Sequence, residues 1–181
     1  VTDQHTTYGP KVIVTTTREA HSVLDAILGN ATDLPVTEHA TDTHGVTLVN
    51  FALFDLLGMQ LSPRIRDLGK ITLYRPVPRA EADTLFPHAG ALLTRKLNLD
   101  LIAEHYDDLL RLAGSLKFGH ATASLLVGKL SASGRQNALA AALKEYGAMR
   151  RTIYACRYLT DPDYRRKISR QLNKGESIHA L

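Results

Sequence analysis

Residues 46–57 (VTLVNFALFDLL) form the most apolar stretch of the chain and constrain its fold more than any other feature. Nine of these twelve residues have apolar side chains, and they cover most sides of a helix instead of one stripe. A helix of this kind is usually buried. We therefore predict a helix over residues 46–57 that ends at Gly58 and is covered by the rest of the domain.

The first 75 residues alternate between strand and helix patterns. β-Branched and apolar runs predict the strands, and helical spacing predicts a further helix over residues 18–28. Pro63 would place the third strand at the edge of a sheet or at an irregular start. This alternation is typical of an α/β layer, so α/β is the predicted fold class. The predicted strands are residues 11–17, 34–42, 61–65 and 71–74.

The composition changes after residue 75. Three prolines between residues 76 and 87 mark a connector, and the pattern beyond it is all helical. Apolar residues recur there at helical spacing, and we interpret these stripes as faces that pack into a core. The predicted helices are residues 99–112, 115–130, 135–159 and 162–172.

Composition limits the class of protein. An apolar fraction of 44% is typical of a globular domain. No apolar run is long enough to span a bilayer, so we expect no membrane partner. The single cysteine, Cys156, fits a reducing, cytoplasmic setting.

Charge is distributed unevenly along the chain. Residues 1–90 carry 7 Lys or Arg and 10 Asp or Glu, which gives −3, whereas residues 91–181 carry 15 and 8, which gives +7. Many of these cations lie between residues 150 and 170. Such a cluster can face phosphates, and a solvated helix face is the alternative.

Carboxylates are the chemical candidates that remain after other site types are considered. The sequence has no nucleophile elbow and no phosphate-binding P-loop. His39 and His44 lack the spacing of a zinc site. Cys156 lies in a helical stripe, where packing is the usual role of a cysteine.

Asp42 and Glu176 are the two carboxylates that we single out. Asp42 ends the strand predicted at residues 34–42, and α/β sheets place their sites at the carboxyl ends of strands. Glu176 follows Lys174 and Gly175, at what we interpret as the start of a new helix. Each has a structural alternative, because an Asp caps helices well and the helix dipole favours an acid in the first turn.

Three short motifs occur in the order TDTHG (residues 41–45), SPRIRDL (62–68) and NKGE (173–176). Together with longer stretches, they resemble the C-terminal catalytic region of the Tn-three family of replicative transposases. The resemblance extends over nearly the whole chain in the same order. The longer stretches are residues 1–28, 39–47, 51–69, 111–132, 135–147 and 172–181.

The resemblance implies a DDE transposase, whose catalytic core has an RNase H-like fold. Three carboxylates of such a core hold two divalent metal ions, Mg²⁺ or Mn²⁺. By motif, Asp42 is the second Asp and Glu176 is the Glu, so both are expected to be catalytic residues and metal ligands. The first Asp of the family falls before Val1. We therefore expect this chain to be a fragment with an incomplete site, inactive by itself.

The resemblance and the helical pattern together imply three parts. Residues 1–75 would be part of an RNase H-like core, without its first strand. Residues 76–160 would be a large all-helical insertion before the final catalytic helix, and residues 161–181 a return segment that carries Glu176. The insertion would account for the 134 positions from Asp42 to Glu176.

An enzyme of this family cuts transposon ends and joins the freed 3′ hydroxyls to target DNA. His44 and Lys174 flank the expected site and could contact the scissile phosphate. Arg64 and Arg66 alternate on the third predicted strand, so both could face DNA or an acidic neighbour. The resemblance also implies DNA as partner, a homo-oligomer in the full-length protein, and a place in the bacterial cytoplasm with the nucleoid.

Two other classes of function stay open at this point. The chain could be a non-catalytic module that binds DNA or mediates oligomerisation, or a helical regulator with no nucleic-acid partner. The distance between the carboxylates of Asp42 and Glu176 separates these classes from the enzyme. About 4–7 Å would suit shared or adjacent metal ions.

Overall fold

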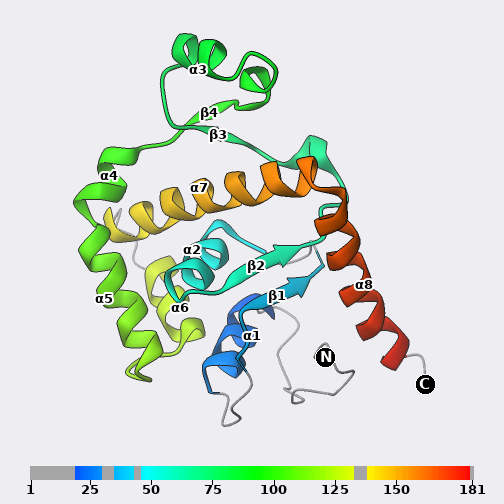
Figure 1. Cartoon of the computed structure of the whole chain (residues 1–181). Coiled ribbons are helices and arrows are strands. Elements are labelled where there is room, and N and C mark those ends of the chain that lie inside the picture. The colour runs from blue at the N-terminus through cyan, green and yellow to red at the C-terminus, as the bar shows by residue number, and fades with distance from the viewer. Residues whose placement is uncertain (1–18, 30–34, 43–45, 133–137, 180–181) are drawn as a thin grey trace.

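The computed structural model describes residues 19–29, 35–42, 46–132 and 138–179 (Figure 1). The strand predicted at residues 11–17 lies outside them. Helices make up most of the described chain, and two small parallel sheets accompany them. The elements are α1 (Glu19–Leu28), β1 (Glu38–Thr41), α2 (Leu48–Leu56), β2 (Gln60–Pro63), η1 (Leu68–Lys70), β3 (Tyr74–Arg75), α3 (Arg79–Leu85), η2 (Gly90–Leu92), β4 (Arg95–Lys96), α4 (Leu99–Glu104), α5 (Tyr106–Lys117), α6 (Ala123–Ala132), α7 (Ala138–Thr160) and α8 (Pro162–His179).

Helix α2 is the buried centre of the structure, as its apolar surface predicts. Residues 50–54 are all buried. The helix begins after Thr47, whose hydroxyl accepts a hydrogen bond from the Asn50 amide at 3.3 Å. It ends before Gly58, which has a φ of +77° that glycine adopts without strain. None of the helices in the described ranges combines the length and apolar character that a membrane crossing requires.

Strands β1 and β2 are parallel, and α2 is the crossover between them. Their register sets Glu38 opposite Gln60 and Thr41 opposite Pro63. This strand–helix–strand order confirms the α/β prediction. Within the described residues each sheet has two strands, β1 with β2 and β3 with β4. The RNase H-like core therefore stays a prediction.

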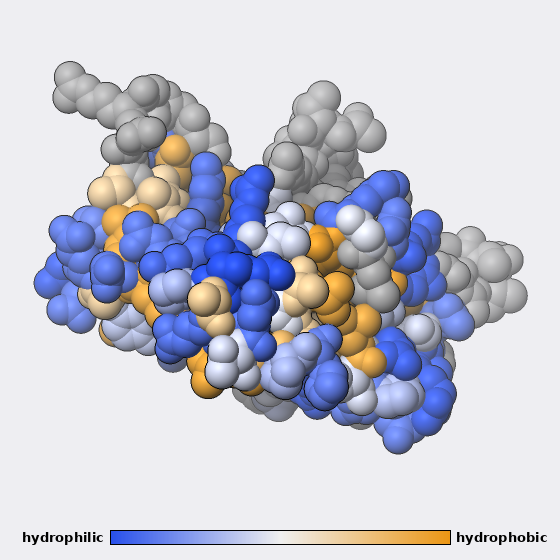
Figure 2. Space-filling view, turned by 90° about the horizontal axis from the view of Figure 1, so that it is seen from above, coloured by the Kyte–Doolittle hydropathy of each residue, from blue (hydrophilic) through white to orange (hydrophobic). Residues whose placement is uncertain are grey.

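Residues 74–96 form an arm that projects from the helical body (Figure 1). The prolines predict a connector here, and the structure adds to it a helix of seven residues, α3, which starts after Pro78. Strands β3 and β4 pair in parallel at the base of the arm. Figure 2, seen from above, shows a mostly hydrophilic face with separate hydrophobic patches. Leu85 and Leu92 of the arm are exposed apolar residues.

Two helix predictions in the middle of the chain are wrong in their boundaries. Apolar spacing predicts one helix over residues 99–112, but α4 ends at Glu104 and α5 begins at Tyr106. The helix predicted over residues 115–130 is also divided, because α5 continues to Lys117 and α6 begins only at Ala123. Gly119, with a φ of +73°, lies in this break. Its freedom to adopt a positive φ permits a turn that the apolar pattern does not reveal.

The two last helices confirm one prediction and correct another. Helix α7 matches the helix predicted over residues 135–159. Helix α8 continues from Pro162 to His179, so Glu176 lies near the end of this helix, and the prediction that a new helix starts there is wrong. A glycine inside a helix costs about 1 kcal/mol, and Gly175 alone does not interrupt α8.

Helix α7 crosses α2 so closely that the backbone at residue 147 contacts the backbone at Leu48. This close approach is possible because residue 147 is glycine. A Cβ atom at this position would overlap the carbonyl group of Leu48. Relief of this overlap would require the two helices to move apart, which would leave gaps in the core. We therefore expect Gly147→Ala to lower the free energy of unfolding by about 3 kcal/mol. Urea denaturation followed by circular dichroism measures this change.

Gly114 in α5 provides the matched control. A Cβ atom there would have no neighbour within 4 Å, so Gly114→Ala should raise the free energy of unfolding by up to about 1 kcal/mol through helix propensity. Equal effects of the two substitutions would contradict the close contact between α7 and α2.

Candidate functional site

Asp42 directly follows β1, at the carboxyl end of the β1–β2 sheet. Because Thr41 lies opposite Pro63 in the parallel register, Asp42 and Arg64 leave the sheet at the same edge. The Arg64 amide donates a hydrogen bond to the Thr41 carbonyl at 2.8 Å. The predicted place of Asp42 at a strand end is confirmed. Thr47 caps α2 instead, so the alternative in which Asp42 caps that helix is wrong.

Two guanidinium groups face the carboxylate of Asp42. Arg66 Nη2 lies 2.6 Å from Asp42 Oδ2, and Arg64 Nη2 lies 3.7 Å from the same oxygen. Strand β2 ends at Pro63, so these arginines follow the strand and do not lie on it as predicted. Both arginines face an acidic neighbour, one of the two alternatives given for them, and contact with DNA stays a prediction. The Asp42 side chain is 37% exposed and that of Arg66 is 53% exposed, so the pair is accessible to solvent.

Tyrosines of α7 hold the segment that carries these arginines. The Tyr154 hydroxyl donates to the Pro63 carbonyl at 2.5 Å, and the Tyr158 hydroxyl donates to the Ile65 carbonyl at 3.5 Å. The ring centroids of Tyr154 and Tyr158 lie 5.9 Å apart. Burial raises the pKa of Tyr154 above its ordinary range, so its hydroxyl stays a neutral donor. The long helix α7 thus fixes the residues on both sides of Arg64.

Glu38 connects both strands to α8. Its Oε1 accepts hydrogen bonds from the hydroxyls of Ser62 and Tyr164, each at 2.7 Å. Its Oε2 lies 2.5 Å from Lys167 Nζ. Burial is the main cause that raises the pKa of Tyr164 to about 12, and its bond to Glu38 acts in the same direction. The sequence does not reveal this cluster of Glu38 with its three partners, because the partners are 24 to 129 positions away from Glu38. The only signal in the sequence is an acidic residue within a strand pattern.

The other predicted site residues are only partly described. Glu176 lies in α8, but its side chain is outside the described side chains, and His44 is outside the described residues. Lys174 lies in α8 and is partly buried. Figure 1 shows the last turns of α8 extending away from the ends of β1 and β2. The pairing of Glu176 with Asp42 stays a prediction.

The side chains at the carboxyl end of the β1–β2 sheet can be compared with the ligands that a divalent metal ion requires. Magnesium prefers hard oxygen ligands, and the accessible carboxylate of Asp42 is of that type. A cation at Asp42 Oδ2 would replace the contact with Arg66. Among the side chains that the structure describes, no three His, Cys, Asp or Glu lie close enough together to hold a metal ion. Asp42 therefore fits as one ligand of a site that needs further residues.

Comparison with known proteins gives a consistent result over the whole chain. A family model described as the Tn3 transposase DDE domain matches residues 1–181. The chain is 44% identical over 179 residues to the transposase for transposon Tn1546 of Enterococcus faecium. It is 42% identical over 181 residues to the transposase for transposon Tn21 of Escherichia coli. These matches cover 99% and 100% of the chain but only 18% of the length of each relative.

Glu38 makes the stability of the fold depend on pH. Burial raises the pKa of this carboxyl, but the hydrogen bonds from Lys167, Ser62 and Tyr164 together bring it below its usual 4.5. The ionised form therefore stabilises the fold above the unfolded pKa, and this contribution is lost as the pH falls through the folded pKa. We expect Glu38→Gln to unfold at a lower temperature at pH 7 and to lose less stability than the unsubstituted chain on acidification.

Thermal unfolding followed by circular dichroism from about pH 7 to about pH 3 measures both effects. Glu104→Gln in α4 is the control, because Glu104 is exposed and should leave the pH profile unchanged. A pH profile of Glu38→Gln parallel to that of the unsubstituted chain would contradict the role of Glu38.

Proposed function

The chain belongs to the family of Tn3 transposase DDE domains, and we propose from this that it forms part of a site that cuts and joins DNA. The reaction is cleavage at transposon ends followed by transfer of the freed 3′ hydroxyl to target DNA. The observation that carries the proposal is the place of Asp42, an accessible carboxylate at the carboxyl end of a parallel strand. The chain spans 18% of the relatives' length, so other segments would complete the site.

Asp42 would serve as a ligand and not as a general base. Two bound Mg²⁺ or Mn²⁺ ions would supply activation of the attacking oxygen and stabilisation of the leaving oxygen at phosphorus. A carboxylate suits these hard cations. Glu176 would be a second ligand. This role requires the carboxylate of Glu176 to lie close to that of Asp42.

Arg64 and Arg66 would act first on Asp42 and then on DNA. Their guanidinium groups pair with the carboxylate and hold it at the strand end. Arginine also binds phosphate in a two-point geometry, and the exposed side chain of Arg66 can turn to a DNA strand. We propose His44 and Lys174 as further contacts to the scissile phosphate.

The division of the chain into three parts that we propose follows from its membership of the transposase family. Residues 1–75 would belong to an RNase H-like core, residues 76–160 to a helical insertion, and residues 161–181 to the segment with the catalytic Glu. The full-length protein would act as a homo-oligomer at the bacterial nucleoid. A DNA-binding module without catalysis is the second candidate, and the excess of cations in residues 91–181 favours it.

The 181-residue chain alone should not cleave DNA. It carries Asp42 and Glu176, and we propose that the first Asp of the site belongs to another segment of a longer transposase. We expect no specific nicking of transposon-end DNA with Mg²⁺ or Mn²⁺, measured on end-labelled duplexes in denaturing gels. Robust, specific nicking by the purified chain would overturn the prediction that its site is incomplete.

Asp42→Asn should abolish catalysis in a longer transposase that carries this sequence. Loss of a metal ligand should lower end cleavage and strand joining together, by at least about 100-fold. Asp108→Asn is the control, because Asp108 also pairs with an arginine, Arg111, at 2.7 Å on an exposed surface. Equal activity of the two variants would exclude Asp42 from the site.

A further inference from the structure

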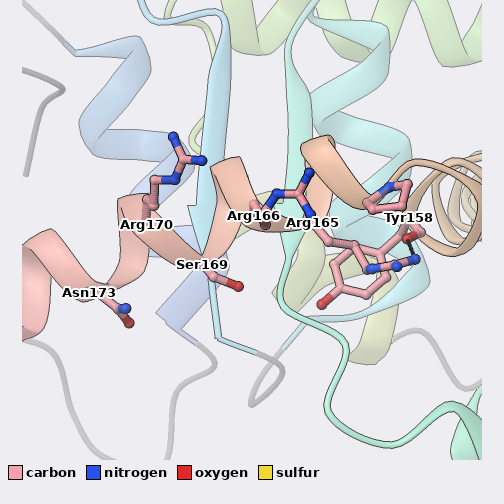
Figure 3. Close-up of a pocket in the computed structure, with 7 residues that line it drawn as sticks. Tyr158, Arg165, Arg166, Ser169, Arg170 and Asn173 are labelled. Atoms are coloured by element: carbon pink, nitrogen blue, oxygen red, sulfur yellow. Dashed lines mark hydrogen bonds between the residues drawn. The ribbon is translucent and has the colours of Figure 1, made fainter.

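A basic hollow lies at the corner between α7 and α8 (Figure 3). We call it the α8 hollow. Figure 3 shows Arg170, Arg166 and Arg165 following one another along α8 toward Tyr158 at the end of α7. The hollow is lined by Tyr158, Pro162, Arg165, Arg166, Ser169, Arg170 and Asn173.

The segment of the chain that carries the hollow is rich in cations. Residues 157–174 contain six Lys or Arg and two Asp, which gives +4, and the chain as a whole also has a net charge of +4. Both acids have local partners. Asp161 accepts a hydrogen bond from the Tyr164 amide at 2.9 Å, and Asp163 pairs with Arg166. The remaining 163 residues are therefore neutral in sum.

Packing of α8 does not need the side chains of Arg166 and Arg170. Tyr164 and Ile168 supply the buried face of α8, and Lys167 is directed to Glu38. Arg166 and Arg170 are exposed. Two long cationic side chains on successive turns repel each other, so their placement on one stretch of α8 is explained better by an anionic partner than by the fold.

Part of the hollow is held rigid. Arg165 Nη1 donates to the carbonyls of Tyr158 and Leu159 at 2.8 and 2.6 Å, which fixes its guanidinium at the helix corner. Beside the hollow, the guanidinium carbon of Arg157 lies 3.9 Å from the centre of the Tyr164 ring. A cationic surface that is already ordered loses less entropy when it binds.

The donors repeat with a regular spacing along α8. Arg166 and Arg170 are four residues apart, as are Ser169 and Asn173, which corresponds to about 6 Å of helix. Guanidinium, hydroxyl and amide groups together match a ligand with repeated negative charges and oxygen acceptors. The backbone of a nucleic acid is such a ligand.

We propose that the α8 hollow binds the phosphodiester backbone of DNA, with Arg166 and Arg170 contacting phosphates. The choice of DNA as the partner rests on the proposed function. A strand bound along the hollow would follow α8 toward the turn that carries Glu176. The hollow thus guides DNA to the end of α8 and takes no part in the reaction.

The test compares two double variants of the 181-residue chain. Arg166→Gln with Arg170→Gln removes two cations from the hollow, and Arg79→Gln with Arg111→Gln removes two exposed cations elsewhere, each paired with an Asp on its own helix. Fluorescence anisotropy of a labelled duplex is recorded at several salt concentrations. We expect the hollow variant to lose about 10-fold in affinity and its salt slope to fall by about 1 to 2. The control variant should bind as the unsubstituted chain does.

Each other outcome overturns the proposal. If both variants lose affinity equally, the chain attracts DNA by net charge alone. If poly-glutamate binds as tightly as DNA and loses affinity in the same variant, the hollow receives an acidic protein instead. Circular dichroism checks folding, and the single variants Arg166→Gln and Arg170→Gln replace the double variant if it unfolds.

Failure of the hollow and failure of the proposed function give different results. The DNA-binding experiment on the two double variants leaves Asp42 unchanged, and Asp42 does not line the hollow. If the hollow does not bind DNA, the result expected for Asp42→Asn in the cleavage experiment stays the same. Loss of cleavage in Asp42→Asn with equal DNA binding by both double variants would therefore overturn the hollow only.

Discussion

The contact between α2 and α7 is the constraint on which the other elements depend. An apolar surface on most sides of α2 has to be covered, and α7 covers it along its length because Gly147 lets the two backbones meet at Leu48. Polar contacts at the same seam fix the direction of α7, since Tyr146 Oη and Arg150 Nη2 lie 2.6 and 2.5 Å from the Asp55 carboxylate. Buried area drives this association, and the pair of contacts to Asp55 gives it one orientation.

The position of α7 decides where the candidate site lies. Once α7 is fixed on α2, Tyr154 and Tyr158 reach the carbonyls of Pro63 and Ile65, and the chain between these carbonyls carries Arg64. The corner after α7 then directs α8 past β1, where Tyr164 and Lys167 meet Glu38. The helical half of the chain therefore does more than cover the sheet. It positions the strand end that carries Asp42 and the helix that carries Glu176.

The sequence predicts those parts of this arrangement that depend on local patterns. The burial of α2, the strand before Asp42 and the length of α7 all follow from apolar spacing over a few turns. Contacts between distant residues do not: Glu38 and Lys167 are 129 positions apart, and one sequence carries no sign that they meet. The turn at Gly119 and the continuation of α8 through Gly175 were missed for another reason. Whether a glycine ends a helix depends on the packing on both sides of it, which local pattern does not contain. The partnership of Asp42 and Glu176 rests on family resemblance, and the shape of α8 alone does not supply it.

Charge balance at Asp42 links the strand end to the α8 hollow. A carboxylate at the edge of a sheet is stable when cations are near, and in the free chain Arg64 and Arg66 provide them. If Asp42 holds a divalent cation, as we propose, the same arginines face a cation of like charge, and a phosphate becomes their better partner. DNA that enters along α8 would bring that phosphate. Binding of DNA and binding of metal would then favour each other, because each removes the other's electrostatic penalty. Under this scheme the guanidinium groups pair with the carboxylate before substrate arrives and move to the DNA backbone when it does.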